Sequence, residues 1–294
     1  MSKRSAMTLL VATDGSAPAR TAVATAVAFP WPRSAKAYGV VARHPLPLDL
    51  PAAALPALED GLRRIAAGAQ RMLAERWPDT EVAVAGPSPV EAILREARRR
   101  HASVIVLGSR GRSGLPRILL GSVSLSVAKR APCSVLLVKR VVRPAKGLVI
   151  GVDGSADARR ALAQVARLAP PRGAPATVVR VVEAIRLPSL SLLPSAVQSV
   201  VGGEAAILQA AQLRSARREV EAAVALLRKA GWRARSEVRV GTPQRELLRA
   251  VKAAGADVVV VGWRGRSNTL ERFFLGGVAE ALLRHAPVSV LVTR

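Results

Sequence analysis

The sequence between residues 108 and 122 is Gly108-Ser-Arg-Gly111-Arg-Ser-Gly-Leu-Pro-Arg-Ile-Leu-Leu-Gly121-Ser122, and a second version of it is Gly262-Trp-Arg-Gly265-Arg-Ser-Asn-Thr-Leu-Glu-Arg-Phe-Phe-Leu-Gly276-Gly277. Each version follows a short apolar run and precedes an amphipathic stretch. Glycines let the backbone approach a bound group closely, and a helix that begins just after them offers free N–H groups to an anion. These two glycine motifs, the first at 108–122 and the second at 262–277, therefore predict phosphate binding and a chain that is built twice.

Two other segments are also present twice. The segment Leu9-Leu-Val-Ala-Thr-Asp14-Gly-Ser16 recurs as Leu148-Val-Ile-Gly-Val-Asp153-Gly-Ser155, and Ala131-Pro-Cys-Ser-Val-Leu-Leu-Val138 recurs as Ala286-Pro-Val-Ser-Val-Leu-Val292. The copies are 139 residues apart from Asp14 to Asp153 but 154 apart from Gly108 to Gly262, so the second copy carries about fifteen extra residues between these points. Repetition along all 294 residues predicts two tandem domains, residues 1–142 and 143–294.

Short apolar runs alternate with longer stretches of helical periodicity in each copy. The runs Val104-Ile-Val-Leu107 and Val258-Val-Val-Val261 are apolar on both faces, as central strands of a parallel sheet are. The pattern predicts an α/β fold with a doubly wound, five-stranded, Rossmann-like parallel sheet in each domain. The expected strands are 7–13, 35–42, 80–85, 103–108 and 134–139, then 147–152, 175–182, 234–240, 257–262 and 288–293. The expected helices are 16–29, 52–76, 88–100 and 121–130, then 155–168, 204–230, 243–254 and 276–285.

Ligands of an open parallel sheet bind beyond the carboxyl ends of the strands, where the strand order reverses. Asp14 lies at the carboxyl end of the first expected strand and Gly108 at that of the fourth, so the two share one crevice if these strands are neighbours. Asp14 would then bind a sugar hydroxyl. The groups that face phosphates would be Gly111, Gly121 and Ser122, with Arg110, Arg112 and Arg117 supplying positive charge. The alternatives are a solvated arginine loop and a plain capped turn at Asp14.

The first glycine motif consists of Gly108, two residues, Gly111, nine residues, Gly121 and Ser122. With this spacing, and with the Asp-Gly-Ser ending of the first strand, the chain resembles the universal stress protein family in a tandem two-domain arrangement. The resemblance covers essentially the whole chain. It implies the adenine nucleotide alpha hydrolase-like fold of that family. It also implies that the final strands, 134–139 and 288–293, pair across the two domains as in an internal dimer.

The resemblance further implies a regulator of the stress response whose first domain binds ATP, or ADP or AMP, with Mg²⁺ bound through the phosphates. By position, Ala12 and Asp14 would border the ribose and the base, and Val40 would meet the adenine through its backbone. The residues near the ribose and phosphates would be Gly108, Arg110 and Gly111, and those that hold the phosphates would be Gly121, Ser122 and Val123.

The second glycine motif departs from this pattern. Ten residues, not nine, separate Gly265 from Gly276, Gly277 replaces the hydroxyl residue, and Trp263 stands in the place of Ser109. Losing a hydrogen bond to a charged group costs about 1.5–3 kcal/mol, roughly ten- to a hundredfold in affinity. We therefore expect weak nucleotide binding, or a structural role alone, at Asp153, Gly262, Gly265, Gly276 and Gly277.

The chain is strongly basic, with 45 Lys and Arg against 20 Asp and Glu and a net charge of +25. Such a charge attracts polyanions, so a nucleic-acid-associated protein is one alternative, although an aromatic content of 3% leaves few platforms for base stacking. Another alternative is an enzyme of the same fold that hydrolyses or activates ATP. The sequence has no P-loop and its three histidines are not at metal-ligand spacings. We expect no catalytic or metal site, and slow ATP hydrolysis at most.

Two segments of low charge are candidates for a lid or a partner surface. Residues 44–57 are rich in proline and residues 187–203 carry no charge, and both segments follow the second strand of their copy, where they should overhang the crevice. The alternative is a loop packed on its own domain. We expect a homo-oligomer or a protein partner to bind there. The single cysteine fits a cytoplasmic location, and no apolar stretch reaches the roughly 18 residues of a membrane helix.

Overall fold

The computed structural model describes residues 6–43, 51–86, 88–111, 120–140, 147–171, 173–185, 194–265 and 275–294. The first half contains β1 (Thr8–Thr13), α1 (Ala17–Ala28), β2 (Lys36–Ala42), a short 3₁₀ helix (Ala52–Ala54), α2 (Leu55–Ala74), β3 (Val82–Ala85), α3 (Pro89–Arg99), β4 (Val104–Gly108), α4 (Ser122–Arg130) and β5 (Ser134–Val138). The second half contains β6 (Leu148–Val152), α5 (Ala156–Ala166), β7 (Pro175–Val182), α6 (Ser195–Lys229), β8 (Arg233–Val240), α7 (Pro243–Ala254), β9 (Val258–Gly262), α8 (Gly277–His285) and β10 (Ser289–Thr293). Every expected strand is present, with bounds within two residues of those expected.

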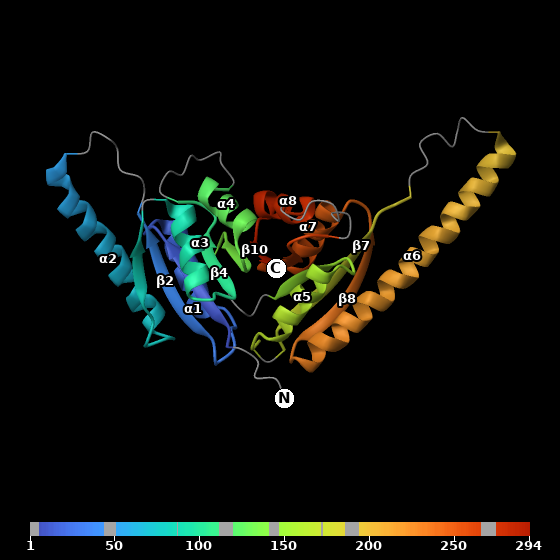
Figure 1. Cartoon of the computed structure of the whole chain (residues 1–294). Coiled ribbons are helices and arrows are strands. Elements are labelled where there is room, and N and C mark those ends of the chain that lie inside the picture. The colour runs from blue at the N-terminus through green and yellow to red at the C-terminus, as the bar shows by residue number, and fades with distance from the viewer. Residues whose placement is uncertain are drawn as a thin grey trace.

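The ten strands form one sheet in the order β3-β2-β1-β4-β5-β10-β9-β6-β7-β8. Neighbouring strands are parallel except β5 and β10, which are antiparallel with Leu136 opposite Leu291. The expected α/β fold with two tandem five-stranded halves is confirmed, and so is the pairing of the two final strands. The two halves meet at the centre of the molecule, beside β10 (Figure 1).

Helices cover both faces of the sheet. The helices α1, α2, α5 and α6 pack on one face, in a core that includes Leu73 and Leu227. The helices α3, α4, α7 and α8 pack on the other face, in a core that includes Leu94 and Leu283. Both cores contain strand residues of the two halves, so the hydrophobic effect stabilises the halves together.

The helix α6 begins at Ser195, and the expected start at 204 was wrong. Gly202 and Gly203 each cost about 1 kcal/mol in a helix relative to alanine, which weakens a helix without necessarily ending it. Each added residue contributes one more backbone hydrogen bond, so the 35-residue helix continues through both glycines to Pro194 at its N-cap. The first part of α6 extends away from the sheet (Figure 1).

This helix also changes the interpretation of the two low-charge segments. Residues 195–203 were expected to form a loop, but they are the projecting end of α6 and most of them are exposed. In the first half, residues 52–54 form a 3₁₀ turn and α2 starts at Leu55. Residues 44–50 and 187–193 lie outside the described part of the chain. No helix within the described ranges is both long and apolar enough to cross a membrane.

Lys139 connects the two halves just beyond β5. Its ammonium group donates a hydrogen bond of 2.7 Å to the carbonyl oxygen of Ala286, at the end of α8. Burial, and secondly the charge of Arg110, lower the pKa of Lys139 from 10.5 to about 8. The charged form of this lysine is therefore less favourable in the folded protein than in the unfolded chain.

We expect the contribution of Lys139 to the free energy of unfolding to rise with pH between about 8 and 10.5. In this window the unfolded chain holds a proton that the folded protein has released, and at lower pH both states hold it and the contribution is smallest. Urea unfolding at several pH values should show a flatter rise for Lys139→Met than for the parent. The exposed Lys36 is the control, since Lys36→Met should keep the parental slope. If the free energy of unfolding of Lys139→Met rose with pH as steeply as that of the parent, the prediction would be contradicted.

Candidate functional site

The first cleft lies where the strand order reverses. The strand β1 is bonded to β2 on one side and to β4 on the other, with Leu9 opposite Val104. The carboxyl ends of β1 and β4 are therefore adjacent, so Asp14, directly after β1, lies near Gly108 at the end of β4. This is the position at which open parallel sheets bind ligands.

One cavity brings together the nine predicted residues of the first domain that the structure describes. It contains about 650 Å³ of space, part of it open to solvent. The nine residues are Ala12, Asp14, Val40, Gly108, Arg110, Gly111, Gly121, Ser122 and Val123. Arg112 and Arg117 lie outside the described residues. The common location of the nine is observed, whereas their roles in binding stay predictions.

Close contacts explain the first two glycines of the motif. A Cβ atom on Gly108 would lie 2.7 Å from the carbonyl oxygen of Pro18, and one on Gly111 would lie 2.7 Å from Oδ2 of Asp14. The other oxygen of Asp14 accepts the N–H of Ser16 at 3.0 Å. The end of β4 therefore passes against the backbone of α1, where no side chain fits, and the loop after it passes beside the Asp14 carboxylate, which a side chain at Gly111 would displace.

The start of α4 forms the polar edge of the cleft. The N–H of Gly121 donates to the carbonyl of Ser109 at 2.8 Å, and the hydroxyl of Ser124 donates to the carbonyl of Gly108 at 2.8 Å. These bonds hold α4 against the glycine loop. The first-turn N–H groups have no acceptor inside the helix, and the side chain of Ser122 is exposed beside them. Together with the helix dipole, this arrangement favours a bound anion.

Much of the remaining lining is apolar. Val40 and Ala42 of β2, Ile93 of α3 and Leu107 of β4 line the cavity. An apolar wall with a few polar groups at one edge is typical of small-molecule sites. The first cleft can therefore hold a ligand that is apolar at one end and anionic at the other.

Seven residues of the lining were not predicted. They are Thr13, Ala19, Ala42, Pro89, Ile93, Leu107 and Ser124. Ile93 and Leu107 have no signal in the sequence, because an apolar residue of a helix or strand looks like any core position. Ser124 does have a signal in the sequence. The first copy reads Gly-Ser-Val-Ser from residue 121 and the second reads Gly-Gly-Val-Ala from residue 276, so Ala279 stands where the first copy has Ser124. Comparison of the copies would have singled it out.

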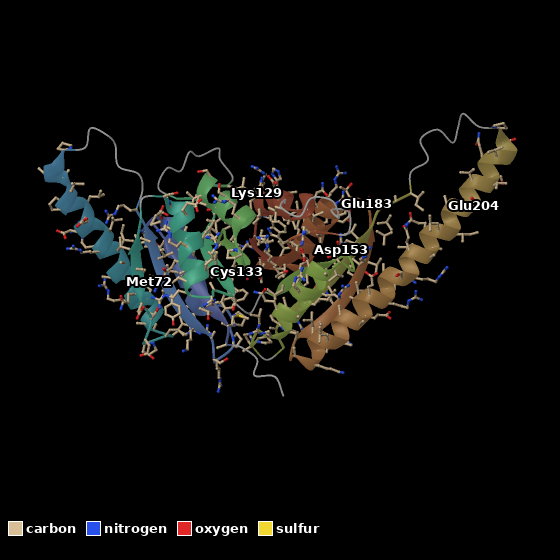
Figure 2. All side chains as sticks on the ribbon, viewed as in Figure 1. Met72, Lys129, Cys133, Asp153, Glu183 and Glu204 are labelled. Atoms are coloured by element: carbon tan, nitrogen blue, oxygen red, sulfur yellow. The ribbon has the colours of Figure 1, made fainter. Side chains whose placement is uncertain are left out.

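The second cleft has the same plan and more space. Its lining includes the five predicted residues Asp153, Gly262, Gly265, Gly276 and Gly277. A Cβ atom on Gly265 would lie 2.9 Å from Oδ2 of Asp153, which matches the contact of Gly111 with Asp14. Residues of α6 and of the end of β7 also line the cleft, which contains about 2310 Å³ including space open to solvent. Figure 2 labels Asp153 and Glu183, two carboxylates of this lining.

Two hydroxyl groups of the first cleft are missing from the second. Gly277 and Ala279 stand at the start of α8, where Ser122 and Ser124 stand at the start of α4. The first-turn N–H groups of α8 remain, but there is neither a hydroxyl donor for a ligand nor the bond that ties Ser124 to the glycine loop.

Trp263 gives the second glycine motif a packing role. The residue is 2% exposed, and its indole N–H donates to the carbonyl of Ala128 in α4, 3.2 Å away. The guanidinium of Arg294 lies over its ring at 4.1 Å. The second motif therefore contacts the first half directly. Phe273 and Phe274, the other aromatic residues of this motif, lie outside the described residues.

The first cleft carries few groups that could transfer protons. Among the described residues, its ionisable lining consists of Asp14 and Arg110. Burial raises the pKa of the Cys133 thiol to about 12, so this thiol is protonated at neutral pH. Within the same described ranges, no three His, Cys, Asp or Glu side chains are grouped to hold a metal ion. The arrangement is suited to recognition of a ligand that has an apolar part and an anionic part.

Comparison with known proteins identifies one family. The model of the universal stress protein family matches residues 6–139 and 145–294. A universal stress protein of Mycobacterium tuberculosis is 34% identical over 248 residues, which cover 79% of this chain and 73% of that protein. A universal stress protein of Archaeoglobus fulgidus has the same fold, with a TM-score of 0.67 and 19% identity over 98% of both chains. A universal stress protein solved in complex with cAMP is 29% identical over 46% of this chain and 97% of its own, with a TM-score of 0.37.

Proposed function

This chain belongs to the universal stress protein family, and from that premise we propose that its first half binds ATP or a related adenine nucleotide and that the protein acts as a nucleotide-responsive regulator of the stress response. The observation that carries the proposal is one cavity, with the start of α4 at its edge, that contains the nine expected residues that the structure describes. The adenine would lie against the apolar lining around Val40. The phosphates would lie at the first turn of α4, near Ser122, with Mg²⁺ bound through their oxygens.

Calorimetric titration with ATP tests this proposal. The expected result is one ATP bound per chain, and titrations with ADP, AMP and cyclic AMP rank the ligands. A protein that binds none of these nucleotides at millimolar concentration would contradict the proposal. If the protein binds no nucleotide but binds DNA with an affinity that falls steeply as the salt concentration rises, the nucleic-acid alternative would be favoured instead.

We infer a binding protein rather than a rapid enzyme. The described lining of the first cleft offers one carboxylate and one guanidinium, and general acid–base catalysis needs groups that exchange protons near neutral pH. ATP incubated with the protein should therefore be recovered largely intact, apart from slow hydrolysis. Multiple turnovers within seconds would contradict this inference and favour an ATP-hydrolysing or ATP-activating enzyme.

We also propose that the projecting part of α6 binds a second copy of the chain. Residues 195–213 contain one charged side chain, Glu204, in a chain of net charge +25. Glu204 lies on this projecting part (Figure 2). Four large apolar side chains are exposed there, namely Val197, Val200, Ile207 and Leu208. An exposed apolar patch is stabilised when another surface covers it, and a segment without Lys or Arg is where two basic chains repel each other least.

Replacing Ile207 and Leu208 together with glutamine is expected to shift the protein from dimer to monomer, because the two side chains are 70% and 54% exposed on this surface. Light scattering after size-exclusion chromatography, over a range of concentrations, measures the mass. The control replaces Leu226 and Val240, which are also exposed apolar residues but lie elsewhere, and it should stay dimeric. A parent protein that is monomeric at all concentrations would contradict the proposal.

A further inference from the structure

Asp157 stands where the first half has a proline. A Cβ atom on Gly108 would lie 2.8 Å from the carbonyl carbon of Pro18, and one on Gly262 would lie 2.8 Å from the carbonyl carbon of Asp157. Each of these residues is the second residue of its helix, Pro18 in α1 and Asp157 in α5. The two positions are therefore equivalent, but only the second carries a charge.

The carboxylate of Asp157 is bound to the second glycine motif. Its Oδ2 atom accepts the backbone N–H of Arg264 at 2.9 Å and lies 3.6 Å from Nε of the same arginine. Its Oδ1 atom pairs with the guanidinium of Arg160. Asp157 is 4% exposed, so the carboxylate is buried, although the side chains of Arg160 and Arg264 are partly exposed. An internal anion thus occupies an N–H group and a guanidinium group of the motif.

Arg264 is the counterpart of Arg110 in the first half. A Cβ atom on Gly276 would lie 3.3 Å from Cα of Arg264, and one on Gly121 would lie 3.4 Å from Cα of Arg110. Both arginines line their clefts. In the first half the position of the carboxylate is taken by Pro18, whose ring carries no charge. The same arginine therefore faces a different electrostatic environment in each half.

The charge of Asp157 also acts on a third arginine, Arg294. Burial, and next the charge of Arg264, lower the pKa of Arg294, whereas Asp157 acts in the opposite direction. Asp157 is thus the ion-pair partner of Arg160 and Arg264, and its charge also acts on Arg294. Without this negative charge, Arg264 would lose its ion pair at the lining of the second cleft, and an unpaired guanidinium group attracts anions.

We propose that Asp157 is the specificity-determining residue that excludes phosphate groups from the second cleft, an inference that rests on nucleotide binding by the first. Asp157 does not itself line the second cleft, but it is bound to Arg264, which does. A phosphate that entered beside Arg264 would therefore find the N–H and the guanidinium group of this arginine already engaged by a carboxylate. The second cleft has about 2310 Å³ of space against about 650 Å³ in the first, both including space open to solvent, so a lack of room would not account for the exclusion.

Titration of two variants with ATP tests this proposal. Asp157→Pro copies the first half, where proline already occupies the equivalent helix position. Asp157→Asn keeps the shape of the side chain and an oxygen for the Arg264 N–H, while the charge is lost. The parent should bind one ATP per chain. In each variant we expect a second ATP to bind. Its affinity should be at least about tenfold higher than that of any second ATP-binding event in the parent.

The control is Asp79→Asn, which changes the net charge equally at an exposed residue of the first half. This variant should still bind one ATP. If it bound a second ATP with the same affinity as the Asp157 variants do, the proposal would be overturned. Inorganic triphosphate is a second probe without a base, and it should bind the Asp157 variants more tightly than the parent. Thermal unfolding identifies the folded variants, and Asp157→Asn decides the result if Asp157→Pro does not fold.

The outcomes separate the two proposals. A parent and a folded Asp157→Asn variant that each bind one ATP would show that Asp157 does not exclude phosphate, and the proposed function would stand. A parent that binds no ATP would contradict the proposed function. In that case only the titration with inorganic triphosphate tests whether Asp157 excludes phosphate groups. Equal triphosphate affinities of the parent and the Asp157 variants would overturn that proposal.

Discussion

Replacing Gly121 with valine is expected to weaken ATP binding by about a hundredfold or more, because the proposed phosphate site depends on this glycine. Its φ of −70° is open to any residue, so no backbone strain arises. A Cβ atom would lie 3.4 Å from Cα of Arg110 and 3.4 Å from the carbonyl oxygen of Ser109. The methyl groups of valine would extend from there between the glycine loop and α4. They would separate the two elements that we expect to contact the phosphates.

The matched control is Gly276→Val at the equivalent position of the second half. Its φ is −61° and its Cβ atom would lie 3.2 Å from the carbonyl oxygen of Trp263, so the local crowding is similar. We expect ATP binding by Gly276→Val to equal that of the parent, since the first cleft is untouched. Equal losses in both variants, measured by calorimetric titration, would mean that the two clefts bind nucleotide alike.

Replacing Gly108 with alanine is expected to destabilise the fold by about 1–3 kcal/mol, which lowers the unfolding temperature by several degrees. The added Cβ atom would lie 2.7 Å from the oxygen and 2.8 Å from the carbon of the Pro18 carbonyl group. These are backbone atoms at the start of α1 and cannot rotate away, so α1 must move from β4. Differential scanning calorimetry measures the effect.

Gly61→Ala is the control for this prediction. Gly61 lies inside α2, and a Cβ atom there would meet no atom within 4 Å. Alanine at this position should raise stability by about 0.5–1 kcal/mol, because glycine is the poorer helix former. An unfolding temperature of Gly108→Ala at or above that of the parent would contradict the account of the contact between β4 and α1.

The positions of the strands could be predicted because most of them are short apolar runs with a clear end. Val104–Leu107 and Val258–Val261 have no polar face, which is typical of central parallel strands. The start of α6 could not be predicted, since a Gly202–Gly203 pair is unfavourable in a helix but is tolerated within a long one. Local preference therefore indicated a later start than the structure has.

The first cleft could be predicted because its residues follow the ends of neighbouring strands. Asp14 and Gly108 are far apart in sequence, but the pairing of β1 with β4 brings their strand ends together. The contact of Asp157 with Arg264 spans 107 residues, and that of Trp263 with Ala128 spans 135. Nothing in local spacing indicates these contacts, because they depend on how α5 and α4 pack against the loop after β9.

The identity of the nucleotide released from the purified protein tests the central claim most directly. Native mass spectrometry of the intact protein, followed by analysis of the released ligand, should find one adenine nucleotide per chain. That nucleotide should be absent from Gly121→Val and present in Gly276→Val. A protein that is purified empty and also fails to bind added ATP would contradict the account.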